Sequence, residues 1–235
     1  MTTYFIHGFL EDNTMWSDID IPPSLQPVFI ELPGHGLRLN EACPADMSEM
    51  ARTLLPLFSA TEFQIIGHSM GGYLISSLIE NGLRPKRIGL FHSKLGEDHS
   101  DKKAQRLRAM ELVKENKSLY IHTMITNLFS SSLRAEMEEK ITSLIQSAQS
   151  ISIDTIIHCH RAMLHRTSGI DLTRHLSIPT YYFAGMEDHS VPFDQIQSEV
   201  AAIGTLAQVT AHPQLGHMGQ WESPKAVQEW LQLFV

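Results

Sequence analysis

The sequence predicts an α/β fold in which a mostly parallel sheet is flanked by helices and interrupted by a helical insertion. Short apolar runs typical of buried strands alternate with stretches of helical periodicity, and such alternation builds right-handed crossover units around a parallel sheet. From about residue 101 to 174 the alternation stops, and the chain is helical in period without a convincing strand. A glycine-flanked serine in GHSMGG also marks a sharp turn between a strand and a helix.

Six strands and three helices are expected outside the insertion. The strands end in Gly- or Pro-containing turns, and the final helix has Pro near its first turn. The expected strands are TTYFIHG (2–8), PVFIELPGHG (27–36), FQIIG (63–67), RIGLFHS (87–93), PTYYFAG (179–185) and AQVTAHP (207–213). The expected helices are MSEMARTLLPLF (47–58), GGYLISSLIENG (71–82) and PKAVQEWLQLFV (224–235).

The insertion contains four helical patterns, which begin at residues 101, 118, 132 and 152. We therefore divide the chain into a core of residues 1–93 and 176–235 and a helical cap of residues 94–175. A length of 235 residues suits one domain with an inserted subdomain.

Composition excludes several classes of protein. The formal net charge of −8 and the scattered cationic residues argue against a nucleic-acid partner. No apolar stretch approaches the roughly 20 residues that cross a bilayer, so no membrane association is expected. Only two cysteines are present and the N-terminus does not resemble a signal peptide, which favours a cytoplasmic protein.

The stretch IIGHSMGG (65–72) has the pattern Gly-x-Ser-x-Gly of a nucleophile turn. Gly67 and Gly71 leave room for the helix to pack closely on the strand, and Ser69 would stand above the sheet edge. The alternative is a glycine-rich turn in which Ser69 only caps the helix.

A serine nucleophile needs a base and a group that orients the base. His217 lies in LGHMGQWESP, between the last strand and the last helix, and is the predicted base among 13 histidines. Asp188 follows the strand YYFAG and is the predicted acid. Glu187 is the neighbouring rival carboxylate.

Backbone N–H groups that stabilise an oxyanion complete such a site. FIHGFL (5–10) ends the first strand with a His-Gly turn, where a substrate carbonyl can approach the backbone. We expect the amides of Phe9 and Met70 to be the two donors, with His7 and Gly8 shaping the loop.

The motifs HGFL, LPGHG, GHSMGG, AGMEDHSVP and GHMGQWESP, in this order and spacing, resemble those of the α/β-hydrolase superfamily. The resemblance covers both halves of the core, and the insertion is similar to the cap of this family. It implies a catalytic triad of Ser69, Asp188 and His217 that acts without a metal or organic cofactor. Because the oxyanion loop already follows the first strand, the first two strands of larger members are missing, and a trimmed sheet of about six parallel strands is expected.

Further residues are expected to line a substrate pocket. The alternative is that each of them only packs within the protein. They come from the oxyanion side, the end of the fourth strand and the cap: His7, Gly8, Phe9, Trp16, His92, Met124, Leu128, Phe129 and Met163. No metal site is expected, because His158 and His160 in HCHRAMLH are two residues apart and face different sides of a helix.

The function expected from this set is a carboxylesterase that acts on a small-molecule ester through an acyl-enzyme. One alternative is a C–C bond hydrolase or lyase similar to the menaquinone-pathway synthase, which needs cationic cap residues. Arg106, Arg108, Arg161 and Arg166 are available for that role. Another alternative is a ligand receptor on a hydrolase scaffold. The natural substrate and the oligomeric state stay open.

Overall fold

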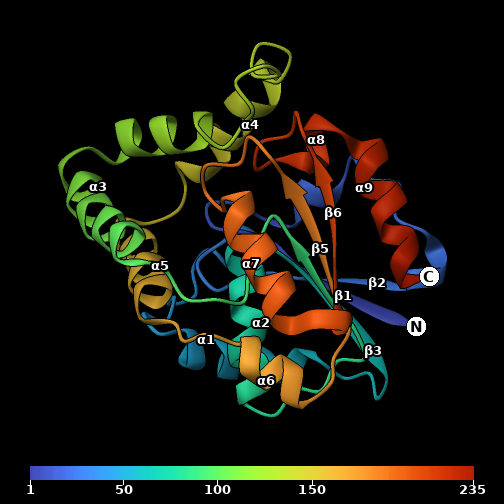
Figure 1. Ribbon diagram of the computed structural model, residues 1–235. Coiled ribbons are helices and arrows are strands. Elements are labelled where there is room, and N and C mark those ends of the chain that lie inside the picture. Colours follow the sequence, from blue (N-terminus) through green and yellow to red (C-terminus); the bar gives the residue numbers. More distant parts are fainter.

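A computed structural model describes all residues from 1 to 235, and its centre is a six-stranded sheet. All neighbouring strands are parallel, in the order β2-β1-β3-β4-β5-β6 (Figure 1). This confirms the trimmed parallel sheet expected from the sequence. The strands are β1 (Thr2–Ile6), β2 (Pro27–Ile30), β3 (Phe63–His68), β4 (Ile88–Phe91), β5 (Thr180–Gly185) and β6 (Ala207–His212).

The burial of each strand explains its sequence. All six residues of β3 and all four of β4 are buried, because these central strands are covered on both faces. Their sequences are accordingly nearly continuous apolar runs. The outer strands β2 and β6 are only partly buried, and Val28 and Phe29 in β2 are exposed.

Helices cover both faces of the sheet. The apolar side chains of α1 (Met47–Leu54), α2 (Met70–Glu80) and α7 (Phe193–Ile203) belong to the larger core on one face. The smaller core on the other face contains Trp16 and the apolar side of α9 (Pro224–Leu231), which follows the short helix α8 (Gly219–Glu222).

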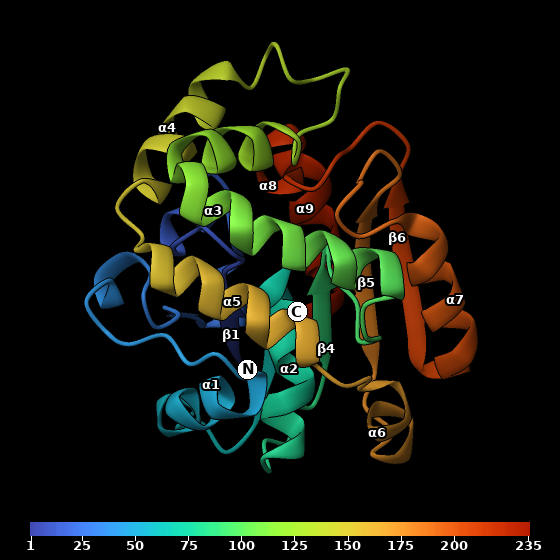
Figure 2. The same cartoon turned by 90° about the vertical axis from the view of Figure 1, so that its left-hand side faces the viewer.

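Four helices lie between β4 and β5: α3 (Ser100–Thr126), α4 (Glu138–Ala148), α5 (Ile153–His165) and α6 (Ile170–His175). Helix α3 is broken at Asn116, whose φ of −155° and ψ of 85° are not helical, and whose side-chain oxygen accepts a bond from Leu119 N. This break separates the first two helical patterns of the insertion. Helices α3, α4 and α5 form the cap, whereas α6 packs beside α2 and α7 at the base of the core (Figures 1 and 2).

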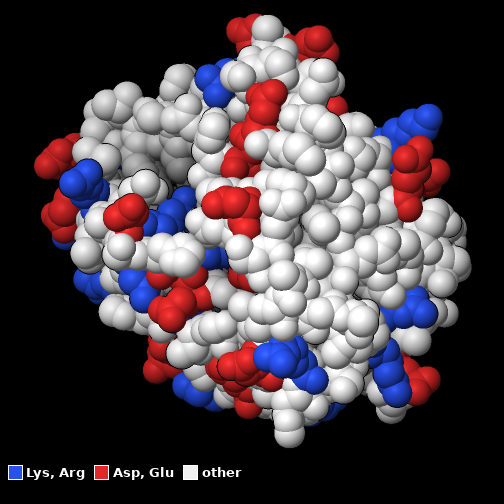
Figure 3. Space-filling view, viewed as in Figure 1, with Lys and Arg blue, Asp and Glu red and all other residues white.

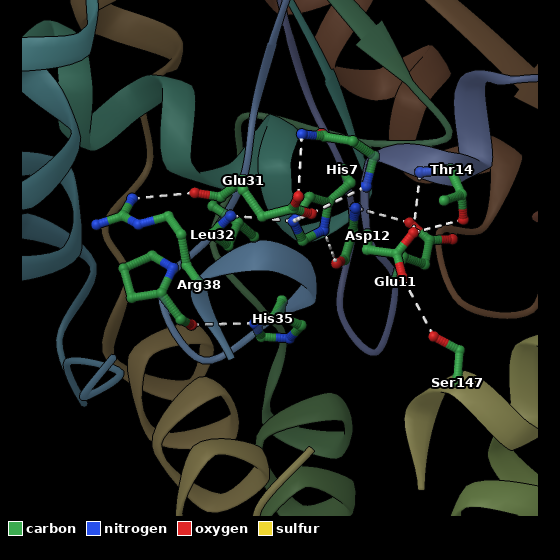
Figure 4. A network of polar contacts seen from close by, with 12 residues as sticks. His7, Glu11, Asp12, Thr14, Glu31, Leu32, His35, Arg38 and Ser147 are labelled. Atoms are coloured by element: carbon green, nitrogen blue, oxygen red, sulfur yellow. Dashed lines mark hydrogen bonds and ion pairs between the residues drawn. The ribbon is translucent and has the colours of Figure 1, made fainter. Parts of the chain in front are cut away.

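Several contacts connect the cap to the core. Ser147 of α4 donates a hydrogen bond to Asp12, which lies in the loop after β1 (Figure 4). His158 Nδ1 donates to the carbonyl of Cys43, and the Sγ atoms of Cys43 and Cys159 lie 3.6 Å apart as free thiols. The cap therefore rests on both the oxyanion side and the loop before α1.

Charged side chains of both signs are interspersed on the face shown in Figure 3, with wide uncharged areas between them. None of the helices combines the length and the apolar character required for a membrane span.

Candidate active site

Ser69 occupies a strained turn between β3, which ends at His68, and α2, which begins at Met70. Its φ of 48° and ψ of −116° are unusual for a residue with a side chain. Its amide donates to the carbonyl of Phe91 at 3.0 Å, which fixes the turn over the sheet. The side chain makes no capping bond to the helix, so the alternative role as an N-cap does not describe this serine.

The neighbouring glycines are required by space. A Cβ atom on Gly67 would lie 2.4 Å from Gly72 N, and one on Gly71 would lie 2.5 Å from the carbonyl oxygen of His7. Both clashes are with backbone atoms, which cannot move away as a flexible side chain would. The close packing of helix, strand and oxyanion loop therefore depends on these two glycines.

His217 lies in the loop between β6 and α8, and its Nδ1 donates a hydrogen bond of 2.6 Å to Asp188 Oδ2. Since Nδ1 carries this proton, Nε2 is the basic nitrogen of the neutral ring. Both side chains are buried, and both follow the carboxyl ends of neighbouring strands. The structure thus brings the predicted acid and base together.

The Asp188 carboxylate is held in its ionised form. Oδ1 accepts hydrogen bonds from the amides of Ser190 at 2.7 Å and Val191 at 2.9 Å. Burial alone would raise the pKa of Asp188, but the charge and hydrogen bond of His217, with a further contribution from His92, hold this pKa well below its ordinary value. A permanently charged carboxylate is suited to stabilise an imidazolium at His217.

The rival carboxylate, Glu187, serves the connection between α3 and α4. Its Oε2 accepts bonds from the hydroxyls of Ser130 at 2.8 Å and Ser131 at 3.1 Å. It makes no contact with His217 among the hydrogen bonds or ion pairs of the structure. Of the two neighbouring carboxylates, only Asp188 therefore meets the base.

The loop predicted to hold the oxyanion follows β1. The amide of Phe9 has no acceptor within the protein, and the amide of Met70 has none within its own helix because Met70 is the first residue of α2. The neighbouring Gly8 amide is already occupied, since it donates to Glu11 Oε2 at 2.6 Å. The two donors predicted from the sequence are thus unoccupied.

Glu11 and His68 form a buried ion pair that the sequence motifs did not reveal. Glu11 Oε2 lies 2.7 Å from His68 Nδ1, and His68 Nε2 donates to the carbonyl of His217 at 3.1 Å. Both ring nitrogens of His68 therefore face acceptors, which favours the imidazolium. Burial lowers the pKa of His68, but the charge and hydrogen bond of Glu11 outweigh burial and raise it above its ordinary value. Burial likewise opposes ionisation of Glu11, yet His68 leaves its pKa lowered.

A cavity of about 290 Å³ lies between the sheet edge and the cap. Ser69 and His217 line it from the core side, and the predicted pocket residues Phe9, Met124, Leu128 and Met163 also line it. The sequence motifs did not single out the other lining residues: Glu11, His68, Tyr73, Lys102, Gln105, Arg106, Ala109, Tyr120, Asn127, His160, His189 and Ser190. Only the arginine among them had been considered as a cap residue.

Three predicted pocket residues on the core side do not line this cavity. His7 is fully buried beneath the loop, where Nδ1 donates to Gly8 O at 2.8 Å and Nε2 accepts from Leu32 N at 3.0 Å (Figure 4). Gly8 lies against Glu11 and His68. Trp16 packs on the opposite face of the sheet, against Phe5 and Phe91. His7 and Gly8 shape the loop after β1, and Trp16 belongs to the core.

Two further expected pocket residues are also placed elsewhere. Phe129 stacks on Trp221, with ring planes 6° apart, and is turned away from the cavity. His92 is buried at the end of β4 with a φ of 46°. Its Nε2 accepts a bond from Gly219 N at 3.2 Å, and its Nδ1 lies 3.5 Å from Asp188 Oδ2. His92 thus lies behind the acid and base rather than beside the substrate.

The histidines of the cap have separate partners. His158 contacts Cys43, whereas His160 Nε2 lies 2.6 Å from the hydroxyl of Tyr120. The donor atoms of His92, Asp188 and His217 lie within 4.8 Å of one another, a spacing that a metal ion could span. In this structure the carboxylate of that cluster accepts hydrogen bonds from His217 and two backbone amides.

Comparison with known proteins agrees with this geometry. The alpha/beta hydrolase family model matches residues 4–230. A search of curated protein sequences gave no match. Among solved structures, an esterase from Thermogutta terrifontis with malate bound has a TM-score of 0.86 at 23% identity, covering 100% of this chain and 89% of that one. A bromoperoxidase from Bacillus anthracis has a TM-score of 0.83 at 18% identity, covering 99% and 91%. An esterase from Exiguobacterium antarcticum has 0.82 at 16%, covering 100% and 91%. At these identities the structures establish the fold, and with the family match across nearly the whole sequence, the chain belongs to the alpha/beta hydrolase family.

Proposed function

We propose that the protein is a serine hydrolase that cleaves a carboxylic ester through an acyl-enzyme. The observation that carries this proposal is the conformation of Ser69. Its backbone is held in a strained turn, its side chain does not cap the helix, and it lines the same cavity as His217. A strained backbone retained at the mouth of a cavity is typical of a functional residue.

In the proposed mechanism, Ser69 Oγ attacks the ester carbonyl while His217 Nε2 takes its proton. Asp188 holds Nδ1–H of the base and stabilises the imidazolium that forms. The developing oxyanion accepts hydrogen bonds from the amides of Phe9 and Met70, and each such donor contributes about 100- to 1000-fold to turnover. His217 then protonates the leaving alcohol, and water repeats the sequence on the acyl-enzyme.

The cavity supports a small substrate. Its volume of about 290 Å³ lies at the lower end of ligand pockets. The lining of the cavity includes the apolar side chains of Phe9, Met124, Leu128 and Met163. These side chains suit a short acyl chain. Two of the structural neighbours are described as esterases, which is consistent with the proposal.

A fluorophosphonate probe tests the proposal directly, because it reacts with activated serines. Labelling of the native protein and its loss in Ser69→Ala are expected. Ser130→Ala serves as a matched control, since Ser130 is a buried serine outside the cavity lining, and it should label like the native protein. A native protein that the probe leaves unlabelled would contradict the serine mechanism.

Turnover of a p-nitrophenyl ester series then tests the ester specificity. Measurable kcat on short chains is expected, falling as the acyl chain outgrows the cavity. Strong labelling with negligible ester turnover at every length would favour the C–C bond hydrolase alternative. Tight ligand binding with turnover near zero would favour a receptor.

A further inference from the structure

One part of the cap side of the cavity is formed by a stripe of α3. Lys102, Gln105, Arg106 and Ala109 all line the cavity that contains Ser69 and His217. Their spacing of three and four residues places them on the same side of the helix. The two cationic members therefore face the space in which a substrate would lie.

The charges behind this wall do not balance. Asp98 accepts a hydrogen bond of 2.5 Å from Arg106 Nε and one of 2.9 Å from Arg166. Arg166 also lies over the ring of Tyr73, with its guanidinium carbon 4.0 Å from the ring centroid. Lys102 makes no ion pair or hydrogen bond in the structure. One carboxylate thus faces three cations, which leaves a formal excess of two positive charges.

No acidic group forms an ion pair with Lys102, and the nearby Asp188 is already bonded to His217. Glu11 is the only acidic residue in the cavity lining, and it is already paired with His68 on the oxyanion side. Burial lowers the pKa of Lys102 and the charge of Arg106 lowers it further, and the opposing charges of Asp98 and Asp188 do not cancel this shift. Partly buried cations without counter-charges are costly, and an anion in the cavity would reduce that cost.

Hydrogen-bond donors on the same wall also lack acceptors. Arg106 Nη1 contacts only the sulfur of Met163, at 3.1 Å, and thioether sulfur is a weak acceptor. His160 is 5% exposed and its Nδ1 has no partner, while its Nε2 is bonded to Tyr120. Burial and the charges of Arg106 and Lys102 lower the pKa of His160 to about 3, so the ring is neutral. When Tyr120 donates to Nε2, the proton on Nδ1 is free for a ligand.

We propose that this wall is an anion subsite for a carboxylate on the substrate, and that the protein acts on monoesters of small dicarboxylic acids. Lys102 and Arg106 bind the free carboxylate, while the ester carbonyl lies against Ser69 and the amides of Phe9 and Met70. The guanidinium of Arg106 supplies directional hydrogen bonds and Lys102 supplies a mobile point charge. The substrate class rests on the proposed esterase function, but binding of the anion does not require turnover.

The experiment uses Ser69→Ala, which prevents turnover, and measures binding by calorimetry. The ligands are the monomethyl esters of succinic, glutaric and adipic acids and the neutral methyl esters of butyric, valeric and hexanoic acids. The dicarboxylic acid monoester that binds best is expected to bind about 10- to 100-fold more tightly than the neutral methyl ester of the same chain length. This is the gain expected for a hydrogen-bonded charge. Adding Lys102→Gln should remove most of this preference.

Arg108→Gln is the matched control, because Arg108 is an exposed cation on the same helix outside the cavity, and it should retain the preference. Equal affinity for charged and neutral esters would overturn the subsite. So would an equal loss of the preference for the charged ester in Lys102→Gln and Arg108→Gln. Lys102 makes no bond in the structure, so its replacement does not break an internal contact, and a thermal melt verifies folding. Failure of the esterase function appears separately, as absence of fluorophosphonate labelling in the native protein.

Discussion

The carboxylate of Glu11 lies 2.7 Å from Nδ1 of His68, the residue directly before the proposed nucleophile, and both side chains are buried. Through this pair the oxyanion loop, the end of β3 and the backbone of His217 are connected, because Glu11 also accepts from Gly8 N and His68 donates to His217 O. The pair should make the stability of the protein depend on pH.

The direction of this pH dependence follows from the shifted pKa values of His68 and Glu11. The raised pKa of His68 contributes stability that is fully present below its unfolded value of about 6.5 and is lost as pH rises through the folded pKa. The lowered pKa of Glu11 contributes stability that is present above about 4.5 and is lost as pH falls through the folded pKa. The contribution of the pair to the free energy of unfolding is therefore largest between these two values.

Glu11→Gln should destabilise the protein by about 3–5 kcal/mol near pH 6, because it leaves His68 buried without its partner. It should also flatten the decline in unfolding free energy above pH 6.5. Urea denaturation at several pH values measures both effects. Glu41→Gln removes an exposed partner of Arg38, and it should change neither the free energy of unfolding nor its decline above pH 6.5 by much. A Glu11→Gln profile parallel to the native one would show that the pair does not control stability.

Asp188→Asn should lower kcat by about 10⁴-fold with little change in KM, because it disfavours the tautomer that leaves Nε2 of His217 basic. Glu187→Gln is the matched control, since its carboxylate binds the serines between α3 and α4. It should leave kcat close to the native value. Steady-state kinetics on the best ester measures both variants. A larger loss in Glu187→Gln would mean that the acid has been assigned to the wrong carboxylate.

Gly71→Ala should destabilise the fold by about 1–3 kcal/mol and slow fluorophosphonate labelling, because the new methyl group meets the carbonyl oxygens of His7 and Ile6. The oxyanion loop would have to move away from α2. Gly82→Ala, at an open position with a φ of 103°, should cost about 1 kcal/mol through backbone strain alone and should keep the native labelling rate. Equal labelling of both variants would contradict a tightly packed turn.

His92→Phe should cost about 1–3 kcal/mol of stability, because the buried Gly219 amide loses its acceptor. The hydrogen bond between Asp188 and His217 stays in place, so kcat should fall much less than in Asp188→Asn. Thermal unfolding and steady-state kinetics on the same preparations separate the two effects. A loss of kcat as large as that of Asp188→Asn would place His92 within the proton-transfer machinery.

Strands and tight turns depend on local sequence patterns, and these features were predicted from the sequence. Buried apolar runs marked all six strands, and the Gly-x-Ser-x-Gly pattern predicted the turn at Ser69, since its glycines are required by backbone spacing. The predicted acid and base lie together because parallel strands bring their carboxyl ends to one edge of the sheet. Asn116 separates two helical patterns, as the periodicity indicated, although the chain continues as one broken helix.

The cavity wall was less predictable, because it depends on how the cap rotates and where it docks. Met124 and Phe129 are close in sequence, yet only Met124 lines the cavity, whereas Phe129 stacks on Trp221 from α8. Glu11 follows the HGFL motif directly, but one sequence gives no sign that its carboxylate is buried against His68. Periodicity places Lys102 and Arg106 on one side of α3 without showing which side faces the nucleophile.

The amide of His217 donates a hydrogen bond of 2.7 Å to the carbonyl of Leu128, at the end of the first cap helix. The base is thus attached to the cap through the main chain as well as to Asp188 through its ring. An outward swing of the cap that carries Leu128 away also releases the loop of the base. The position of the predicted base therefore depends on the cap as well as on the carboxyl edge of the sheet.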